Sequence, residues 1–237
     1  MNKPRSDDPV AIITGAGSGI GRETAKMLSE SGYRLVLAGR RVEMLDQTGA
    51  LIRGEWISVA TDIGNPADAA ALVEAAVGQY GRIDALINNA GYAPLIPIGQ
   101  MDVQTIERVF DVNAIGPAAA IVKVWPVFER QGSGCVVNIS SMATDDPFPG
   151  FFAYAAAKAA VEVMVKSCAI EGEGIGVRAY GVAPGAVETR MLRSIMSEET
   201  LPRDQCLSPE QIAQVITECV LGKRVGENGM TIRIPSP

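Results

Sequence analysis

The stretch Val10–Gly21 reads VAIITGAGSGIG, a short apolar run that leads directly into glycines at Gly15, Gly19 and Gly21. The apolar run has strand character, and the ETAKMLSESG that follows the glycines has helical character. A glycine-rich turn from a strand into a helix presents free backbone N–H groups and the positive end of the helix dipole, which favour a pyrophosphate. The spacing G-x-x-x-G-x-G differs from the general dinucleotide pattern G-x-G-x-x-G, so the run alone is also compatible with a simple tight turn.

Strand-like runs recur along the chain and alternate with amphipathic helical segments. The predicted strands are residues 10–14, 34–38, 56–60, 84–87, 134–139, 176–182 and 229–233. This alternation predicts an α/β fold: a Rossmann-like, doubly wound, parallel seven-stranded sheet with helices on both faces, a three-layer sandwich. A length of 237 residues, 47% of them hydrophobic, suits one domain over residues 1–237, with a core at about 10–189.

Polar or glycine-rich positions follow five of the predicted strands. They are Gly15 after the first, Asp62 after the third, Asn89 after the fourth, Ser141 after the fifth and Pro184 after the sixth. The carboxyl ends of parallel strands share one edge of the sheet, and ligands of such sheets bind beyond that edge. The sequence therefore predicts one site to which all five loops contribute.

Five motifs occur in a definite order: TGAGSGIG at 14–21, NNAG at 88–91, NISS at 138–141, YAAAK at 154–158 and PGAVET at 184–189. With these motifs the chain resembles the short-chain dehydrogenase/reductases, in their branch with TGxxxGxG and YxxxK motifs. The resemblance runs from about residue 10 to residue 189. Tyr154 follows Ser141 at the family's interval, so Ser141 rather than Ser140 is the matching serine.

The resemblance implies a catalytic tetrad of Asn113, Ser141, Tyr154 and Lys158. Tyr154 and Lys158 are four positions apart in an Ala-rich segment, so a helix places both on one face. A lysine ammonium near the phenol is expected to lower the tyrosine pKa from about 10 and to make Tyr154 a general acid and base near neutrality. In the family, the serine bonds the substrate oxygen, the lysine also bonds the nicotinamide ribose, and the asparagine holds a water that relays protons to the lysine.

The resemblance also implies the residues that bind the cofactor. Asp62 is expected to bond the adenine amino group, although a loop or helix-cap role is the alternative because Asn65 and Pro66 follow at a helix start. The Val187 backbone and the Thr189 hydroxyl are expected to bond the nicotinamide carboxamide. The full expected set is Gly15, Ser18, Gly19, Ile20, Arg40, Arg41, Asp62, Ile63, Asn89, Ala90, Gly91, Tyr154, Lys158, Pro184, Gly185, Val187 and Thr189.

The end of the second predicted strand, LAGRR at 37–41, bears on which cofactor is preferred. A carboxylate at this place accepts hydrogen bonds from the ribose 2′-OH of NAD, whereas arginine suits the 2′-phosphate of NADP. Gly39 stands where NAD-preferring relatives commonly carry aspartate, and Arg40 and Arg41 follow it. NADP(H) is therefore favoured over NAD(H), with Arg40 the better candidate; the alternative is that both arginines are solvated residues at a helix start.

These residues predict hydride transfer between a nicotinamide cofactor and a small-molecule carbonyl or primary or secondary alcohol. Two alternatives stay open, an NAD-dependent alcohol dehydrogenase of the same family and a non-catalytic relative that senses the cofactor. Substrate choice is expected to depend on the loops 92–101 and 141–154 and on a lid at about 190–207.

Composition argues against several other classes of protein. The net charge of −6, the pI near 4.9 and the lack of a basic stripe argue against a nucleic-acid-binding surface. No apolar run reaches the ~18 residues that a membrane helix needs. The absence of histidine and the four scattered cysteines exclude a Ser–His hydrolase and disfavour a metal site. A cytoplasmic protein is expected, and the family resemblance with the Ala-rich helices at about 114–130 and 153–171 predicts a homotetramer, or alternatively a dimer.

Overall fold

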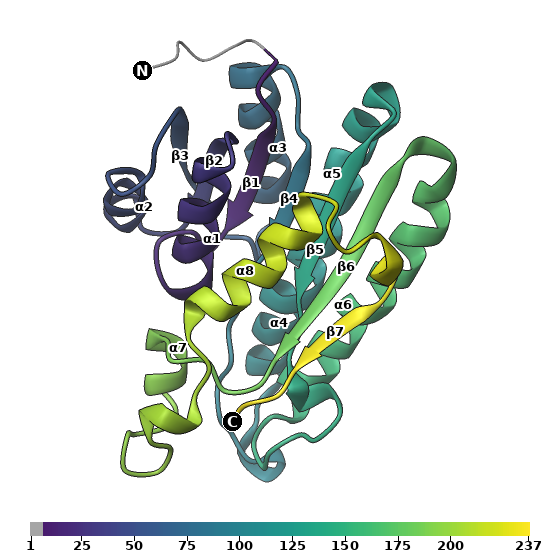
Figure 1. Cartoon of the computed structure of the whole chain (residues 1–237). Helices are drawn as coiled ribbons and strands as arrows, with labels where there is room; N and C mark the ends of the chain where they lie inside the picture. Colours follow the sequence, from purple (N-terminus) through teal and green to yellow (C-terminus); the bar gives the residue numbers. More distant parts are fainter. Residues whose placement is uncertain (1–6) are drawn as a thin grey trace.

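The computed structural model describes residues 7–237, so the first six residues of the polar start MNKPRSDDP lie outside the described part. Seven strands form one sheet (Figure 1). They are β1 (Val10–Thr14), β2 (Arg34–Gly39), β3 (Trp56–Ala60), β4 (Ala85–Asn88), β5 (Gly134–Ile139), β6 (Val177–Pro184) and β7 (Thr231–Ile234). All neighbouring pairs are parallel, in the order β3-β2-β1-β4-β5-β6-β7. The predicted doubly wound parallel sheet is confirmed.

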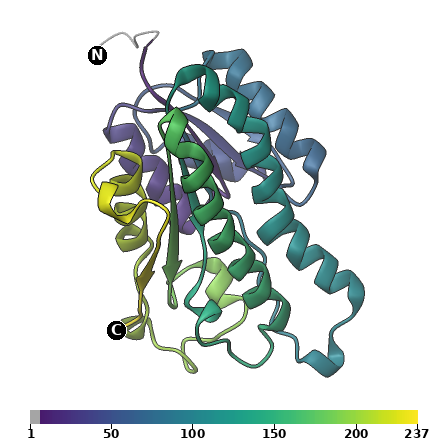
Figure 2. The ribbon, with the colours of Figure 1, turned by 90° about the vertical axis from the view of Figure 1, so that its right-hand side faces the viewer.

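Helices cover both faces of this sheet. The α-helices of the described part are α1 (Gly19–Glu30), α2 (Val42–Gly49), α3 (Pro66–Tyr80), α4 (Val103–Phe110), α5 (Gly116–Gln131), α6 (Phe152–Gly172), α7 (Arg190–Arg193) and α8 (Pro209–Val220). Helices α1, α2 and α8 pack on one face, whereas α3, α5 and α6 pack on the other, as the two views in Figures 1 and 2 show. The predicted three layers are therefore present.

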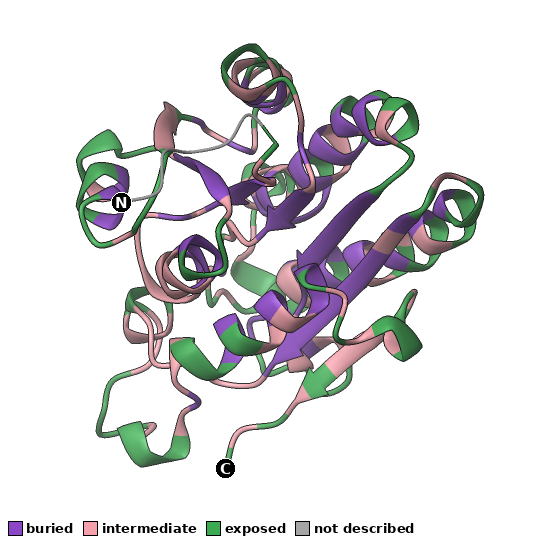
Figure 3. Cartoon of the chain, turned by 45° about the horizontal axis from the view of Figure 1, so that its top comes forward, coloured by how far each residue is buried: buried purple, intermediate pink, exposed green. Residues whose placement is uncertain are grey.

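Successive residues of a strand point to opposite faces of the sheet, and both faces are buried here. In β1, Val10 and Ile12 join the core beneath α3 and α5, whereas Ala11 and Ile13 join the core beneath α1 and α8. Figure 3 shows the consequence: central strands that are buried along their length, between helices whose outer faces are exposed. The strands consequently read as continuous apolar runs, as expected of a parallel sheet covered on both sides.

The strand order reverses between β1 and β4, because the chain builds β2 and β3 on one side of β1 and then returns to add β4 on the other. Loops on the two sides of such a reversal diverge and leave a crevice beyond the carboxyl ends of the strands. After β6 the chain forms a segment that we call the lid, residues 190–207, which contains α7. A bridge between Val187 and Leu207 returns the chain to the loop that follows β6. Within the described part, no helix is long and apolar enough to cross a membrane.

Candidate active site

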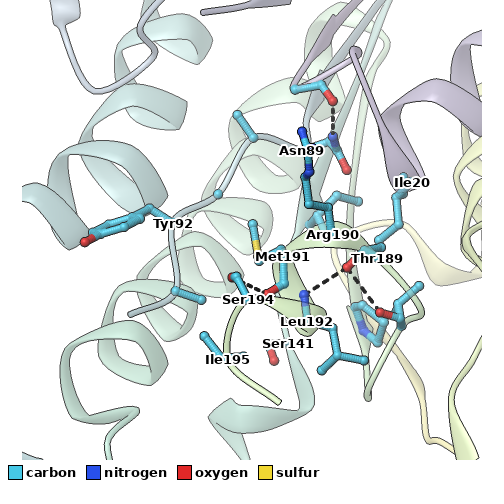
Figure 4. A pocket seen from close by; sticks show the side chains of 18 of the residues that line it. Ile20, Asn89, Tyr92, Ser141, Thr189, Arg190, Met191, Leu192, Ser194 and Ile195 are labelled. Atoms are coloured by element: carbon cyan, nitrogen blue, oxygen red, sulfur yellow. Dashed lines mark hydrogen bonds between the residues drawn. The ribbon is translucent and has the colours of Figure 1, made fainter. Parts of the chain in front are cut away.

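A cleft of about 1190 Å³ lies beyond the carboxyl ends of the strands, between the glycine loop, the loops after β4, β5 and β6, and the lid (Figure 4). Every residue of the expected cofactor set lines this cleft, and so does Ser141. Asn113, the remaining predicted site residue, lies behind the cleft wall and is fully buried. The structure thus brings together motifs that are up to 174 positions apart in the chain, from Gly15 to Thr189.

The glycine loop is held in a shape that only glycine allows. Gly15 has φ +68°, and a Cβ on Gly21 would lie 2.5 Å from the Gly15 carbonyl oxygen. The loop ends at Ser18, the N-cap of α1, whose extended backbone carries no side-chain capping bond. The first N–H groups of α1 are therefore not capped by Ser18 and face the cleft, as an anion-binding helix terminus requires.

The turn after β4 is fastened to the end of β1. The Thr14 hydroxyl accepts hydrogen bonds from the backbone N–H groups of Asn89 and Ala90, both at 3.0 Å. In return, the Asn89 side-chain amide donates to the Thr14 carbonyl at 2.8 Å. Asn88 instead points into the sheet, where its Nδ2 donates to Oδ1 of buried Asn138 at 2.9 Å. Asn88 is thus structural, whereas Asn89 and Ala90 present their backbone to the cleft.

Arg40 and Arg41 follow β2 at one end of the cleft, where both are exposed and line its wall. Among the described residues, neither guanidinium has a hydrogen bond or an ion pair. Asp62 is different, because Arg108 on α4 donates from Nη2 to both of its carboxylate oxygens, at 2.9 and 2.8 Å. Partial burial raises the pKa of Asp62, but the bonds from Arg108 and from the Gly64 N–H outweigh it, so this pKa lies below its ordinary value. The helix cap of α3 is Asn65 rather than Asp62.

Ser141 and Tyr154 meet at the other end of the cleft. Ser141 follows β5, and its Oγ accepts the Ala143 N–H at 3.1 Å. Tyr154 is half-buried in the first turn of α6, packed on Phe151 with ring centroids 5.1 Å apart. One turn later, the buried Lys158 donates from Nζ to the Ile139 carbonyl at 2.8 Å, and this Nζ lies 5.7 Å from the centre of the Tyr154 ring. The side-chain spacing expected from Y-x-x-x-K is therefore present.

The electrostatics of this pair differ from the expectation. Burial raises the pKa of Tyr154 to about 12, and a hydrogen bond with Ser141 offsets this only in part. Burial also lowers the pKa of Lys158 to about 8. The expected lowering of the tyrosine pKa by the lysine is thus wrong for the protein chain alone, because the loss of hydration penalises the phenolate and only the hydrogen bond with Ser141 opposes it.

Asn113 lies in a π-helical turn, η2 (Asp111–Ile115), between α4 and α5. This turn is why α5 begins at Gly116, two residues after the predicted start. The Asn113 Nδ2 donates to the carbonyls of Tyr92 at 2.7 Å and Val109 at 2.9 Å. Its Oδ1 lies 3.2 Å from where a Cβ of Gly91 would be, and Lys158 Nζ lies 3.8 Å from the same point. Asn113 and Lys158 therefore both lie against Gly91, and the Asn113 Oδ1 also accepts the Tyr92 N–H at 3.2 Å.

The loop after β6 carries Val187 and Thr189, the two residues that are expected to bond the carboxamide, and both line the cleft. The Thr189 hydroxyl donates to the Val187 carbonyl at 3.2 Å and accepts the Leu192 N–H at 3.2 Å (Figure 4). Thr189 is thus also the N-cap of α7, a role that the sequence reasoning missed. A hydroxyl has one donor and two acceptor positions, so one acceptor position stays available for a ligand.

The part of the cleft beyond Tyr154 is mainly apolar. Phe148, Met191 and Ile195 line it together with Tyr92, and they come from the loop before α6, the lid and the loop after β4. Asp145 does not contribute a charge here, because Arg233 binds its carboxylate at 2.7 and 2.8 Å. The sequence reasoning missed Arg108, Arg190 and the Ile139 carbonyl as parts of the site, since none of them belongs to a motif.

Comparisons with known proteins agree with this geometry. The family model described as short chain dehydrogenase matches residues 9–200. An uncharacterized oxidoreductase of Listeria monocytogenes is 36% identical over 222 residues, which cover 89% of this chain and 90% of the relative. Among solved structures, the 3-ketoacyl-(acyl-carrier-protein) reductase of Brucella melitensis complexed with NADH has a TM-score of 0.90 at 28% identity, covering 98% of both chains. An actinorhodin polyketide ketoreductase with NADPH has a TM-score of 0.92 at 25% identity and also covers 98% of both. The chain therefore belongs to the short-chain dehydrogenase/reductase family and is an oxidoreductase.

Proposed function

We propose that this oxidoreductase interconverts a carbonyl compound and the corresponding primary or secondary alcohol, with NADP(H) as the hydride carrier. The observation that carries the proposal is the meeting of Ser141, Tyr154 and Lys158 in the same cleft as the glycine loop. This placement, together with the family motifs, supports the roles proposed for the four tetrad residues and the cofactor residues. Conversely, a relative that only senses the cofactor would not need Ser141 and Tyr154 to face the cleft together.

The polar groups that line the cleft match those of a nicotinamide dinucleotide. The N-terminus of α1 would hold the pyrophosphate, Asp62 and Ile63 the adenine, and Val187 and Thr189 the carboxamide. The Oδ2 of Asp62 accepts one hydrogen bond among the described residues, from Arg108. It can therefore accept a second hydrogen bond, from the adenine amino group. When bound, the reduced nicotinamide supplies the hydride that adds to the carbonyl carbon.

The residues of this chain supply the proton and hold the substrate oxygen. Tyr154 donates its phenolic proton to the carbonyl oxygen as hydride reaches the carbon, and Ser141 donates a hydrogen bond to the same oxygen. Lys158 would hold the nicotinamide ribose. With the help of Asn113, which also lies against Gly91, it would return a proton to the Tyr154 phenolate. A tyrosine whose pKa is raised to about 12 carries its proton at neutral pH, as the acid of a carbonyl reduction must.

The preference for NADP(H) rests on Arg40 and Arg41. Both are exposed at the end of β2 with unpaired guanidinium groups in the described part, and Gly39 brings no carboxylate to repel a 2′-phosphate. NAD-dependent alcohol oxidation is the second candidate, since relatives with either cofactor share this fold.

The apolar lining by Phe148, Met191 and Ile195 supports an uncharged, partly apolar substrate, over which the lid would close.

Parallel fluorescence titrations with NADPH and NADH, followed by activity on a panel of ketones and aldehydes, test this function. We expect NADPH to bind more tightly, and Arg40→Ala to weaken NADPH binding about tenfold without affecting NADH, because a charge-assisted bond to the 2′-phosphate is lost. Tyr154→Phe should lower turnover at least about 100-fold while leaving the cofactor Kd unchanged.

The outcomes separate the candidates. Tighter binding of NADH than of NADPH would change the proposed cofactor to NAD(H) and leave the proposed hydride transfer unchanged. Activity that survives Tyr154→Phe would refute the acid role of Tyr154. Failure of the wild-type protein to bind either dinucleotide would refute the proposed function as a whole.

A further inference from the structure

Arg190 is the first residue of the lid, and two contacts fix its place. A Cβ on Gly19 would lie 3.1 Å from the Thr189 methyl group, so the residue before Arg190 touches the glycine loop. A Cβ on Gly91 would lie 3.4 Å from the Met191 Cε, so the residue after it reaches the turn that follows β4. Arg190 therefore bridges the two backbone segments that flank the crevice between β1 and β4.

The side chain of Arg190 points into the cleft. It lines the cavity, and Figure 4 shows it extending from α7 toward Asn89, with Ile20 to its side. The opposite wall is the N-terminus of α1 with its uncapped N–H groups. A guanidinium and a helix N-terminus thus face the same space, and both favour a negative charge.

Nothing in the described part of the chain neutralises Arg190. Its guanidinium has no hydrogen bond or ion pair there, whereas the other arginines of the lid are paired: Arg193 with Glu188 and Arg203 with Glu198. The carboxylates that line the cleft are Asp62, which Arg108 already binds, and Asp146 in the loop before α6. An unpaired cation directed at a helix N-terminus is a feature that a bound anion would complete.

We propose that Arg190 binds the pyrophosphate of the dinucleotide from the lid side, opposite the N–H groups of α1. This assignment rests on the proposed function, since it requires a dinucleotide in the cleft. The planar guanidinium donates two parallel hydrogen bonds to phosphate oxygens, which a lysine at this place would not reproduce. The pyrophosphate is common to NADP and NAD, so Arg190 contributes to binding of both.

An anionic group of the substrate is the competing ligand for Arg190. The apolar surroundings of Tyr154 disfavour it, because Phe148, Met191 and Ile195 line that part of the cleft. The cation nearest to Tyr154, Lys158, is buried and already donates to the Ile139 carbonyl. The pyrophosphate and a substrate anion can be told apart by kinetics. Loss of a cofactor contact raises the cofactor Kd, whereas loss of a substrate contact raises only the substrate KM.

Cofactor titrations of the full chain and its variants test the proposal. Arg190→Gln should weaken both NADPH and NADH by about tenfold, and Arg190→Lys should recover only part of the loss. Arg203→Gln is the matched control, because Arg203 is also a lid arginine but does not line the cleft, and it should leave both Kd values unchanged. Arg40→Ala is the second control and should affect NADPH alone.

Each result decides between named alternatives. Equal weakening of both dinucleotides by Arg190→Gln, with circular dichroism and Tm unchanged, supports the assignment. Unchanged Kd values with a raised substrate KM would overturn it in favour of a substrate anion, and weakening of NADPH alone would overturn it in favour of the 2′-phosphate. If the wild-type protein binds NADPH but Arg190→Gln binds it equally well, only this inference fails; if the wild-type protein binds no dinucleotide, the proposed function fails with it.

Discussion

Lys158 is an ionisable side chain placed where hydration is largely lost, with only 4% of its surface exposed. One hydrogen bond, to the Ile139 carbonyl, holds the ammonium in place. Burial penalises the charged form of lysine and the charged form of tyrosine alike, so the pKa of Lys158 falls to about 8 and that of Tyr154 rises to about 12. At neutral pH both residues therefore carry their protons, the state from which a carbonyl can be reduced.

This arrangement predicts the pH dependence of the reaction. A group whose pKa is lowered loses its proton as the pH rises through that value, so Lys158 becomes neutral above about pH 8. Carbonyl reduction should be flat below this point and fall above it, whereas alcohol oxidation, which needs the tyrosine deprotonated, should rise with pH. Measurement of kcat/KM in both directions from about pH 6 to about pH 10 checks this. A reduction rate that rises through pH 8 would contradict the prediction.

At the scale of single elements, the lid is held in its shape by Arg193. The Nε of Arg193 donates to the Glu188 carboxylate at 3.0 and 3.1 Å, its Nη2 also binds that carboxylate, and its Nη1 donates to the Leu201 carbonyl at 2.8 Å. At the ends of the lid, the Leu207 N–H donates to the Ala186 carbonyl at 2.8 Å. The partly buried Arg193 guanidinium thus links the start of the lid to Glu188, just before the lid, and to Leu201 in its middle.

Replacing Arg193 should therefore loosen the lid without unfolding the sheet. In Arg193→Gln we expect amide exchange in the lid to accelerate about tenfold and the substrate KM to increase, because several charge-assisted bonds are lost. Hydrogen exchange followed by mass spectrometry measures the change. Arg203→Gln removes an exposed ion pair of the same lid and should change little. Unchanged exchange in Arg193→Gln would show that the lid is held by its other contacts.

At the scale of the whole molecule, two long helices leave apolar side chains on the surface. Val122 on α5 and Val163 and Ile170 on α6 are 69%, 61% and 76% exposed. Figure 2 shows these two helices on the same side of the molecule, and they contact each other. The association predicted from the sequence, a homotetramer or alternatively a dimer, would cover such side chains.

Sedimentation equilibrium of the wild-type protein and of Val163→Glu tests that association. We expect the variant to sediment at a lower mass than the wild type, because a carboxylate buried in an apolar contact loses its hydration. Leu51→Glu is the control, since Leu51 lies after α2, far from α5 and α6 in the fold, and is 58% exposed. A wild-type protein that sediments as a monomer would refute both the tetramer and the dimer.

The sequence by itself determined the sheet and the motif residues of the site. Parallel strands covered on both faces require continuous apolar runs, and these runs located all seven strands to within two residues. Because the carboxyl ends of parallel strands meet at one edge, the strand pattern alone predicts that Gly15, Asp62, Asn89, Ser141 and Pro184 contribute to one site. The spacing of Tyr154 and Lys158 likewise depends only on helix geometry.

Only the tertiary structure decided the properties that depend on surroundings. The pKa values of Tyr154 and Lys158 follow from the depth of burial, which the Y-x-x-x-K spacing does not contain. Arg108 reaches Asp62 from 46 positions away in the chain, and Arg190 faces the glycine loop because the lid folds back over the cleft. Local sequence specifies elements, whereas charge, hydration and the pairing of distant side chains arise only when the elements are packed.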